Sequence, residues 1–246
     1  MARILMYSGG IDSYILRNLY DFKLSECLFV NVGTKDAQRE WDLIIDQGRG
    51  VNYVDFQEMK VWELENKILP FRNHMLALIG AQFANEIYFG FTAGDTTKDK
   101  DWVFKAQMEG ILNYFGSDRE KIGIEFSPTE KYEICMPLKG KTKAEIIYDY
   151  LEYWQMQGFD TAYGAELLLS STRSCYEGGT LQCGKCRTCV RNYVALSLNL
   201  VPDSLLQRYY RDDPKKYLQM GLDYARIKGR GQEIKEFEQC MKQKGL

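Results

Sequence analysis

The N-terminal half of the chain alternates short apolar runs with helical patterns, and no other feature constrains the fold as strongly. Residues 3–7, 27–32, 51–56 and 87–91 are apolar runs of strand length, and residues 74–85 have the pattern of a buried helix. Strands joined through helices run parallel, because such a crossover returns the chain to the same end of the sheet. The sequence therefore predicts an α/β fold with a doubly wound, mostly parallel sheet, which binds ligands at the carboxyl ends of its strands.

The chain is longer than this sheet requires. Its 246 residues leave room for one α/β domain and an additional part. The alternation weakens beyond about residue 116, and a later region rich in charged and amide side chains places leucines and tyrosines at 205–206 and 209–210 on one helical face. We expect the α/β domain over residues 1–160 and a C-terminal helical region over residues 161–246.

Composition excludes several classes of protein. The 45% of hydrophobic and 27% of charged residues are close to the averages of globular proteins, so the chain is not disordered. A net charge of −2 argues against binding nucleic acid through charge alone, and small partners are expected instead. The chain has no run of 18 uncharged apolar residues, and Gly9 comes too early for a signal peptide. We expect no membrane partner and a cytoplasmic location, where cysteines stay mostly reduced.

A glycine-containing loop lies between the first predicted strand and the following helix. It reads Ser8-Gly9-Gly10-Ile11-Asp12-Ser13. Adjacent glycines let the backbone approach an anion, a helix N-terminus points N–H groups at it, and Ser8 and Ser13 add hydroxyl donors. The loop lacks the Gly-Lys-[Ser/Thr] of a Walker A motif. By themselves these residues fit phosphate binding or an ordinary glycine turn in which Asp12 or Ser13 caps the helix.

Four cysteines follow in one short segment, at the spacing C-x7-C-x2-C-x2-C. They are Cys175, Cys183, Cys186 and Cys189. Two C-x-x-C steps can close a tetrahedral zinc site, and a reducing compartment disfavours disulfides. An iron–sulfur cluster and buried cysteines without metal are the alternatives. Because the protein would supply all four ligands, we expect a structural site with no open position.

The glycine loop resembles the pyrophosphatase loop, S-G-G-x-D-S, of enzymes that cleave ATP between the α- and β-phosphates and transfer AMP. Together with the cysteine segment, it resembles the 7-cyano-7-deazaguanine synthases of queuosine biosynthesis. That family has T-x-S-C-Y followed by C-G-x-C-x-x-C-x-x-R, which residues 172–176 and 183–191 match. Further matching positions are Pro70, Arg72, Asn73, Gly90, Asp95, Asp101, Lys143 and Glu145. The resemblance covers residues 3 to about 197.

This resemblance implies an ATP-dependent conversion of 7-carboxy-7-deazaguanine and ammonia into 7-cyano-7-deazaguanine, through adenylated intermediates. It implies one structural Zn²⁺ per chain, Mg²⁺, ATP as co-substrate and a homodimer. The implied catalytic residues are Ser8, Asp12, Ser13 and Lys143. The implied nucleotide-binding residues are Ser8, Gly9, Gly10, Asp12, Ser13, Gly33, Arg72, Asn73 and Gly90. Asp95 and Asp101 would contact the substrate, and the four cysteines would bind zinc.

The chain also departs from the family. Residues 32–36 (VGTKD) replace an aromatic-Gly-Gln-Arg-His segment, and residues 99–103 (DKDWV) replace Tyr-Pro-Asp-Cys-Arg, of which Asp101 alone remains. Apart from the resemblance, Arg72 and Asn73 read as a helix start capped by Asn73, and His74, the only histidine, as a structural residue.

Two other functions fit these residues. One is a related AMP-forming enzyme that stops at the amide or acts on another carbonyl, as in tRNA thiolation. The other is a nucleotide-binding protein without turnover. Sulfurtransferases generally use redox-active or cluster-bound cysteines and a basic RNA-binding face, whereas this chain is mildly acidic and its cysteines are spaced for a closed zinc site. No role is predicted for the region after residue 200.

Overall fold

The computed structural model describes residues 2–34, 37–64, 69–95, 97–116, 131–175, 177 and 181–246. The chain forms two compact units, and it passes between them several times. Unit 1 comprises Met1–Ser8, Asp21–Phe91 and Asp95–Lys139, and unit 2 comprises Gly9–Tyr20, Thr92–Gly94 and Gly140–Leu246. The predicted domain boundary at residue 160 stays a prediction, because compactness does not show which segments fold independently.

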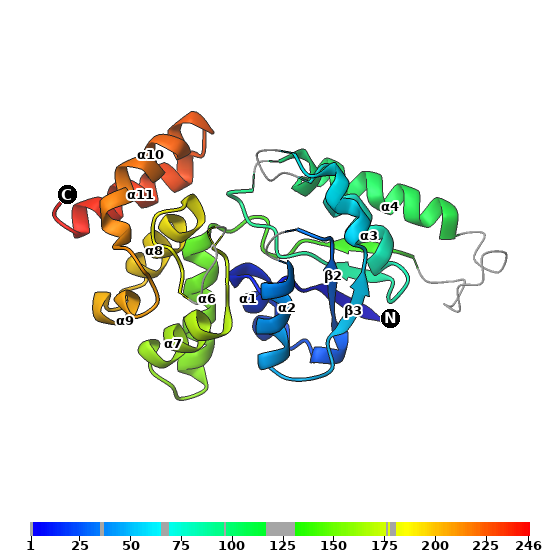
Figure 1. Ribbon diagram of the computed structural model, residues 1–246, viewed down its shortest axis with the longest axis horizontal. Coiled ribbons are helices and arrows are strands. Elements are labelled where there is room, and N and C mark those ends of the chain that lie inside the picture. The colour runs from blue at the N-terminus through cyan, green and yellow to red at the C-terminus, as the bar shows by residue number, and fades with distance from the viewer. Residues whose placement is uncertain are drawn as a thin grey trace. The chain divides into compact units, whose positions relative to one another are not determined.

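Unit 1 is built on a five-stranded sheet in the order β3-β2-β1-β4-β5. Strands β2 and β3 are labelled in Figure 1. Its strands are β1 (Arg3–Met6), β2 (Cys27–Asn31), β3 (Asn52–Asp55), β4 (Glu86–Tyr88) and β5 (Glu133–Cys135). Its helices are α2 (Ala37–Asp46), α3 (Arg72–Gly80) and α4 (Trp102–Gly116), with short 3-10 helices η1 (Leu24–Glu26), η2 (Gln57–Trp62) and η3 (Lys98–Lys100). All four strand pairings are parallel, and Leu5 of β1 lies between Cys27 and Tyr88. The predicted α/β class with a parallel sheet is confirmed.

Helices cover both faces of this sheet. Leu28 of β2 belongs to the buried cluster that contains Ala77 of α3 and Phe104 of α4. Phe29, the next residue, stacks on Trp41 of α2 with 5.4 Å between the ring centroids. Since successive residues of a strand face opposite sides, α2 lies on one face of the sheet and α3 and α4 on the other.

Two observed elements are shorter than the apolar pattern predicts. The run 87–91 predicts a strand through Phe91, whereas β4 ends at Tyr88. The neighbouring strands β1 and β5 end at Met6 and Cys135, so residues beyond Tyr88 have little strand to pair with. Helix α3 ends at Gly80 rather than at residue 85, and the N–H groups of Gln82 and Phe83 then bond the carbonyls three residues back, in turns.

Unit 2 is helical. Its elements are α1 (Ile11–Leu19), α6 (Lys143–Met156), α7 (Thr161–Ser171), α8 (Arg187–Leu198), α9 (Asp203–Gln207), η4 (Pro214–Tyr217), α10 (Leu218–Ile227) and α11 (Gly231–Gln243). Helix α6 packs against α1, α7 and α8, and its Tyr150 is fully buried beside Tyr14. The C-terminal region after residue 200 folds as the helices α9, α10 and α11 (Figure 1). Among the described helices, none is long and apolar enough to cross a membrane.

Candidate metal centre and nucleotide loop

The four cysteines of the C-terminal segment lie together at the start of α8. Their Sγ atoms are all within 4.8 Å of one another, and those of Cys183 and Cys189 are 3.8 Å apart. A zinc–thiolate bond of about 2.3 Å corresponds to an edge of about 3.8 Å in a tetrahedron of sulfurs. The four side chains therefore fit a structural metal such as zinc.

The backbone around the cluster supports thiolates. The N–H groups of Cys183 and Cys186 donate to the Sγ atoms of Cys175 and Cys183 at 3.3 and 3.2 Å. Gly184 has a φ of +79°, and a Cβ there would lie 2.0 Å from the carbonyl oxygen of Asp212, so this turn requires glycine.

Ionisation of the cluster is uneven without a cation. Hydrogen bonds from Cys186 and Cys189 lower the pKa of Cys175, whereas contacts with Cys175 and Cys186 raise the pKa of Cys189. Four thiolates this close repel one another, and a bound divalent cation offsets that repulsion. The donor set is therefore suited to a cation rather than to four free thiols.

The glycine loop leads directly into α1. Gly10 is the N-cap of α1, in extended backbone, and as a glycine it has no side chain with which to cap the helix. The alternative in which Asp12 or Ser13 caps the helix is therefore not what the structure shows, because both fall inside the first turn. The Ser13 hydroxyl donates to the Gly10 carbonyl at 3.1 Å, and Gly9 has a φ of +68°. The loop thus has the positive-φ glycine and the helix N-terminus that anion binding uses.

Lys143 and Asp12, both predicted catalytic residues, are brought together in unit 2. The side chain of Lys143 is 7% exposed, and its Nζ donates to both carboxylate oxygens of Asp12 at 2.7 and 3.0 Å. Lys143 is the first residue of α6, which begins with a reciprocal capping box between Thr142 and Glu145. A nearly buried ammonium is thereby paired and held beside the first turn of α1.

In unit 1, Arg72 and Asn73 begin α3. The N-cap is Phe71, with a φ of +58°, so the prediction that Asn73 caps this helix is wrong. Asn73 is buried, and its amide donates to the Asp99 carboxylate at 2.7 Å. Asn73 is the second residue of α3, so it lies inside the first turn and not at the cap position. The nucleotide-binding roles of Arg72 and Asn73 stay predictions.

Asp95 and Asp101 lie beyond β4. Asp101 Oδ1 accepts a hydrogen bond from the Phe104 N–H at 2.8 Å, which is N-cap geometry for α4. Asp95 pairs with Lys100 at 3.2 Å. Burial lowers the pKa of Lys139, which donates to the Asp95 carbonyl at 2.7 Å. Both aspartates therefore have local structural roles, and their contact with substrate stays a prediction.

The remaining predicted residues of unit 1 are Ser8, Gly33 and Gly90. Gly33 has a φ of +74°, and a Cβ there would lie 2.6 Å from the Gln57 carbonyl oxygen, so the turn itself requires glycine. Ser8 is exposed and is the second residue after β1, and Gly90 is the second residue after β4. Their roles toward a nucleotide stay predictions.

His74 has the structural role predicted for it, and two cysteines outside the cluster are not nucleophiles. The His74 ring packs edge-on against Phe104, with 5.0 Å between centroids. Burial raises the pKa of Cys135 to about 11 and also raises that of Cys240, so both are thiols rather than nucleophilic thiolates at neutral pH.

Two sets of contacts in unit 2 are not indicated by the sequence. The first joins the glycine loop to the residues before Cys175: the Arg173 N–H donates to the Gly9 carbonyl at 3.1 Å, and the Ile11 N–H donates to Ser174 Oγ at 3.3 Å. The matching T-x-S-C motif contained Ser174, but nothing in the motif indicates its partner.

The second set involves the C-terminal helix. Glu233 of α11 is buried and accepts hydrogen bonds from Arg191 and from Arg230, the latter at 3.2 Å. A Cβ at Gly94 would lie 2.0 Å from Glu233 Oε1. The region after residue 200 therefore packs against the turn that precedes Asp95.

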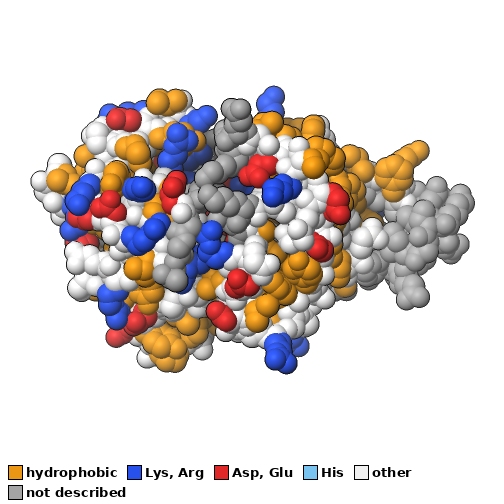
Figure 2. Space-filling model, in the orientation of Figure 1, with side chains coloured by type: hydrophobic (Ala, Val, Ile, Leu, Met, Phe, Trp, Pro, Cys, Tyr) orange, Lys and Arg blue, Asp and Glu red, His pale blue; other side chains and the backbone are white. Residues whose placement is uncertain are grey.

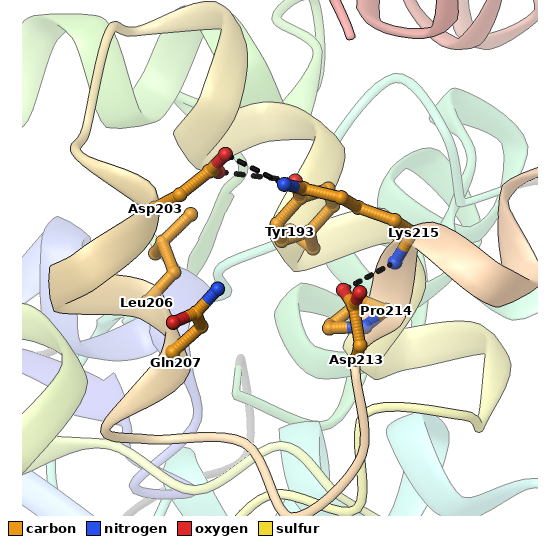
Figure 3. A pocket seen from close by; sticks show the side chains of 7 residues that line it. All are labelled: Tyr193, Asp203, Leu206, Gln207, Asp213, Pro214 and Lys215. Atoms are coloured by element: carbon orange, nitrogen blue, oxygen red, sulfur yellow. Dashed lines mark hydrogen bonds and ion pairs between the residues drawn. The ribbon is translucent and has the colours of Figure 1, made fainter. Parts of the chain in front are cut away.

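A small cavity beside α9 is too small for a substrate (Figure 3). Its volume of about 10 Å³ is about that of one water site. Asp203 on its wall accepts hydrogen bonds from Lys215 and Lys244, both at 2.8 Å, and from the Tyr193 hydroxyl at 3.2 Å. This network ties η4 and the end of the chain to α8 and α9.

Replacing Asp203 with asparagine is expected to destabilise unit 2 at neutral pH but not in acid. Burial alone would raise the pKa of Asp203, but hydrogen bonds from Lys215 and Lys244 outweigh it and hold the pKa below its usual value of 3.8. A depressed folded-state pKa contributes stability above the unfolded-state value and loses it as pH falls through the folded-state value. The free energy of unfolding in urea at pH 7 should be lower for Asp203→Asn than for the wild type. This difference should shrink below about pH 4. A difference independent of pH would contradict this assignment.

Comparison with known proteins places the chain in a family. The sequence model described as "Queuosine biosynthesis protein QueC" matches residues 43–199, which include Lys143 and all four clustered cysteines but not the glycine loop. The 7-cyano-7-deazaguanine synthase of Methanosarcina mazei is 26% identical over 169 residues, which are 67% of this chain and 61% of that protein. The 7-cyano-7-deazaguanine synthase 2 of Sulfurisphaera tokodaii is 23% identical over 234 residues, 81% of this chain and 46% of that protein. The chain thus spans less than two thirds of the length of either curated relative. With well over half of its length matched by the family's own pattern, this chain belongs to the QueC family of queuosine biosynthesis proteins.

Proposed function

We propose that this protein is an ATP-dependent 7-cyano-7-deazaguanine synthase. The observation that carries the proposal is the paired Lys143 and Asp12 at the N-terminus of α1, directly after two glycines, in a chain of this family. Both relatives described above are named as synthases of this product. A cytoplasmic location would keep the clustered cysteines reduced, and neither a membrane nor a nucleic acid is expected as partner.

The reaction needs activation of a carboxylate. Ammonia does not displace oxide from 7-carboxy-7-deazaguanine, so the carboxylate first attacks the α-phosphorus of ATP and releases pyrophosphate. Ammonia then displaces AMP and gives the amide. The amide oxygen attacks the α-phosphorus of a second ATP and releases pyrophosphate, and departure of AMP, with loss of the two amide protons, leaves the nitrile. ATP is cleaved only in the two adenylation steps, one molecule in each, and no covalent protein nucleophile is required.

The protein's part is positioning and charge stabilisation. The N–H groups at the start of α1 and the hydroxyls of Ser8 and Ser13 would hold the pyrophosphate, with the helix dipole favouring the anion. Lys143, oriented by Asp12, retains a third N–H donor for a phosphate oxygen. Arg72 is the second candidate cation, and Mg²⁺ bound to the phosphates would offset their charge.

The direct test is a product analysis. The purified protein is incubated with ATP, Mg²⁺, ammonium and 7-carboxy-7-deazaguanine, and the products are identified by mass spectrometry. We expect the nitrile together with AMP and pyrophosphate. The amide as the final product would indicate the related AMP-forming activity instead, and ADP without AMP would contradict the assignment of the loop.

Recognition of the base is assigned to Asp101, because a carboxylate accepts the paired N–H groups of a guanine-like edge. Asp101→Asn keeps an adequate cap for α4 but presents an amide to the base. We expect affinity for the deazapurine to fall about 5- to 150-fold, the usual range for unpaired buried donors. Calorimetric titration measures this fall. Unchanged affinity at normal stability would mean that Asp101 only caps α4 and does not bind the base.

The expected homodimer is supported by the outward face of α4 (Figure 2). Trp102, Tyr114 and Phe115 are 60%, 75% and 61% exposed. Such side chains offer about 150–250 Å² each, so these three alone expose on the order of 400 Å², against about 800 Å² per partner in a stable interface. The exposed positions of this helix carry no charge, and they are Trp102, Val103, Ala106, Gln107, Gly110, Ile111, Tyr114 and Phe115. A neutral face can meet its own copy without repulsion.

Ile111→Asp is expected to convert the dimer into a monomer. Ile111 is 43% exposed on this face, and burying a carboxylate against a second copy is costly. Val61→Asp, at an 80% exposed position of η2, is the matched control and should remain a dimer. Light scattering after size exclusion reads the mass directly. A wild-type protein that is monomeric at about 50 µM would contradict the proposed interface.

A further inference from the structure

The residues just before Cys175 hold the nucleotide loop through the two hydrogen bonds described above. Gly9 and Ile11 flank Gly10, the N-cap of α1, and both are bonded to the pair Arg173 and Ser174. These contacts all lie within unit 2. One hydrogen bond on each side of Gly10 fixes its backbone more firmly than either bond would alone.

The segment that supplies these bonds is itself anchored at both ends. On one side, the Thr172 hydroxyl is buried and donates to the Leu168 carbonyl of α7 at 2.7 Å. The Arg173 guanidinium donates to the Thr172 and Leu169 carbonyls at 2.9 and 3.3 Å. On the other side, Cys175 Sγ accepts the Cys183 N–H at 3.3 Å inside the cluster of thiols. Ser174 therefore lies in a short span between the end of α7 and the metal centre.

We infer that Ser174 is a positioning residue, which transmits the rigidity of the cysteine cluster to the loop that would hold the pyrophosphate of ATP. The part concerning ATP rests on the proposed function, but the restraint on the loop does not. The hydroxyl acts through the Ile11 N–H, at the first residue of α1, and it fixes where the N-terminus of that helix points.

Hydrogen exchange on the full-length, metal-loaded protein tests the restraint without requiring turnover. In Ser174→Ala, exchange of the Ile11 amide is expected to accelerate about two- to tenfold, as the loss of one neutral hydrogen bond implies. Ser174→Thr keeps the hydroxyl and should restore slow exchange. Ser170→Ala is the matched control, because Ser170 lies on α7 and bonds only its own helix at Leu167 among the contacts described.

A second measurement addresses the nucleotide. The Michaelis constant for ATP should rise in Ser174→Ala, with recovery in Ser174→Thr and a melting temperature close to that of the wild type. Unchanged exchange at Ile11, or equal acceleration in Ser170→Ala, would overturn the inference. Faster exchange with no activity in any variant would instead indicate that the restraint exists and the proposed function is wrong.

Discussion

Lys143→Met is expected to slow the release of pyrophosphate by about 10²- to 10³-fold, the usual effect of removing one preorganised group that stabilises charge in a transition state. Methionine keeps the length and apolar stem of the side chain, so the packing at the start of α6 is preserved. The Asp12 carboxylate that remains is 29% exposed, and water can solvate it. The melting temperature should therefore change little while turnover falls.

Lys141→Met is the matched control. Lys141 lies two residues earlier, is 49% exposed and pairs with Asp149 at 2.6 Å, so its loss should leave the rate unchanged. Asp12→Asn should behave differently from Lys143→Met, because it leaves a nearly buried ammonium without its carboxylate and lowers the melting temperature. If Lys143→Met released pyrophosphate at the wild-type rate, Lys143 would not be a catalytic residue.

Local patterns explain why much of the fold could be predicted. A strand buried on both faces is a continuous apolar run, and β1 and β2 are such runs. Strand β5 has three residues, Glu133, Ile134 and Cys135, and a segment so short and mixed carries no periodic signal. Phe71 caps α3 at a positive φ, which no sequence pattern indicates for phenylalanine.

Some residues of the candidate site could likewise be predicted from local patterns, and others could not. Metal ligands within one short segment are recognisable from their spacing alone, so the cysteine cluster was predictable. Lys143 and Asp12 are 131 residues apart, and only the family resemblance connected them before the structure did. Ser174 bonds Ile11, and Glu233 bonds Arg191, and both of these partners lie far away in the sequence. A pair of that kind produces no local sequence pattern.

The cysteine cluster should bind one zinc per chain, and Cys186→Ser should abolish most of that binding. Structural zinc contributes on the order of 10 kcal/mol to folding in small peptides, and losing even about 4 kcal/mol shifts the melting temperature of a chain of this size by about 10 °C. Elemental analysis of the fresh protein measures the metal, and calorimetry measures the melting temperature. We expect less than half an equivalent of zinc in the variant and a melting temperature lower by about 10 °C or more.

Serine at position 186 also separates the loss of metal from damage to the helix. Cys186 is the N-cap of α8, and serine is among the most favourable residues at that position, so the start of the helix should not suffer. Cys135→Ser is the control and should retain zinc and stability, because Cys135 is not in the metal-ligating group found among the described residues. A variant Cys186→Ser that melts like the wild type would show that the cluster does not depend on metal, and iron in the fresh wild-type protein would favour the alternative of an iron–sulfur cluster. If Cys186→Ser loses both zinc and stability while its helix cap is intact, the metal itself stabilises the fold.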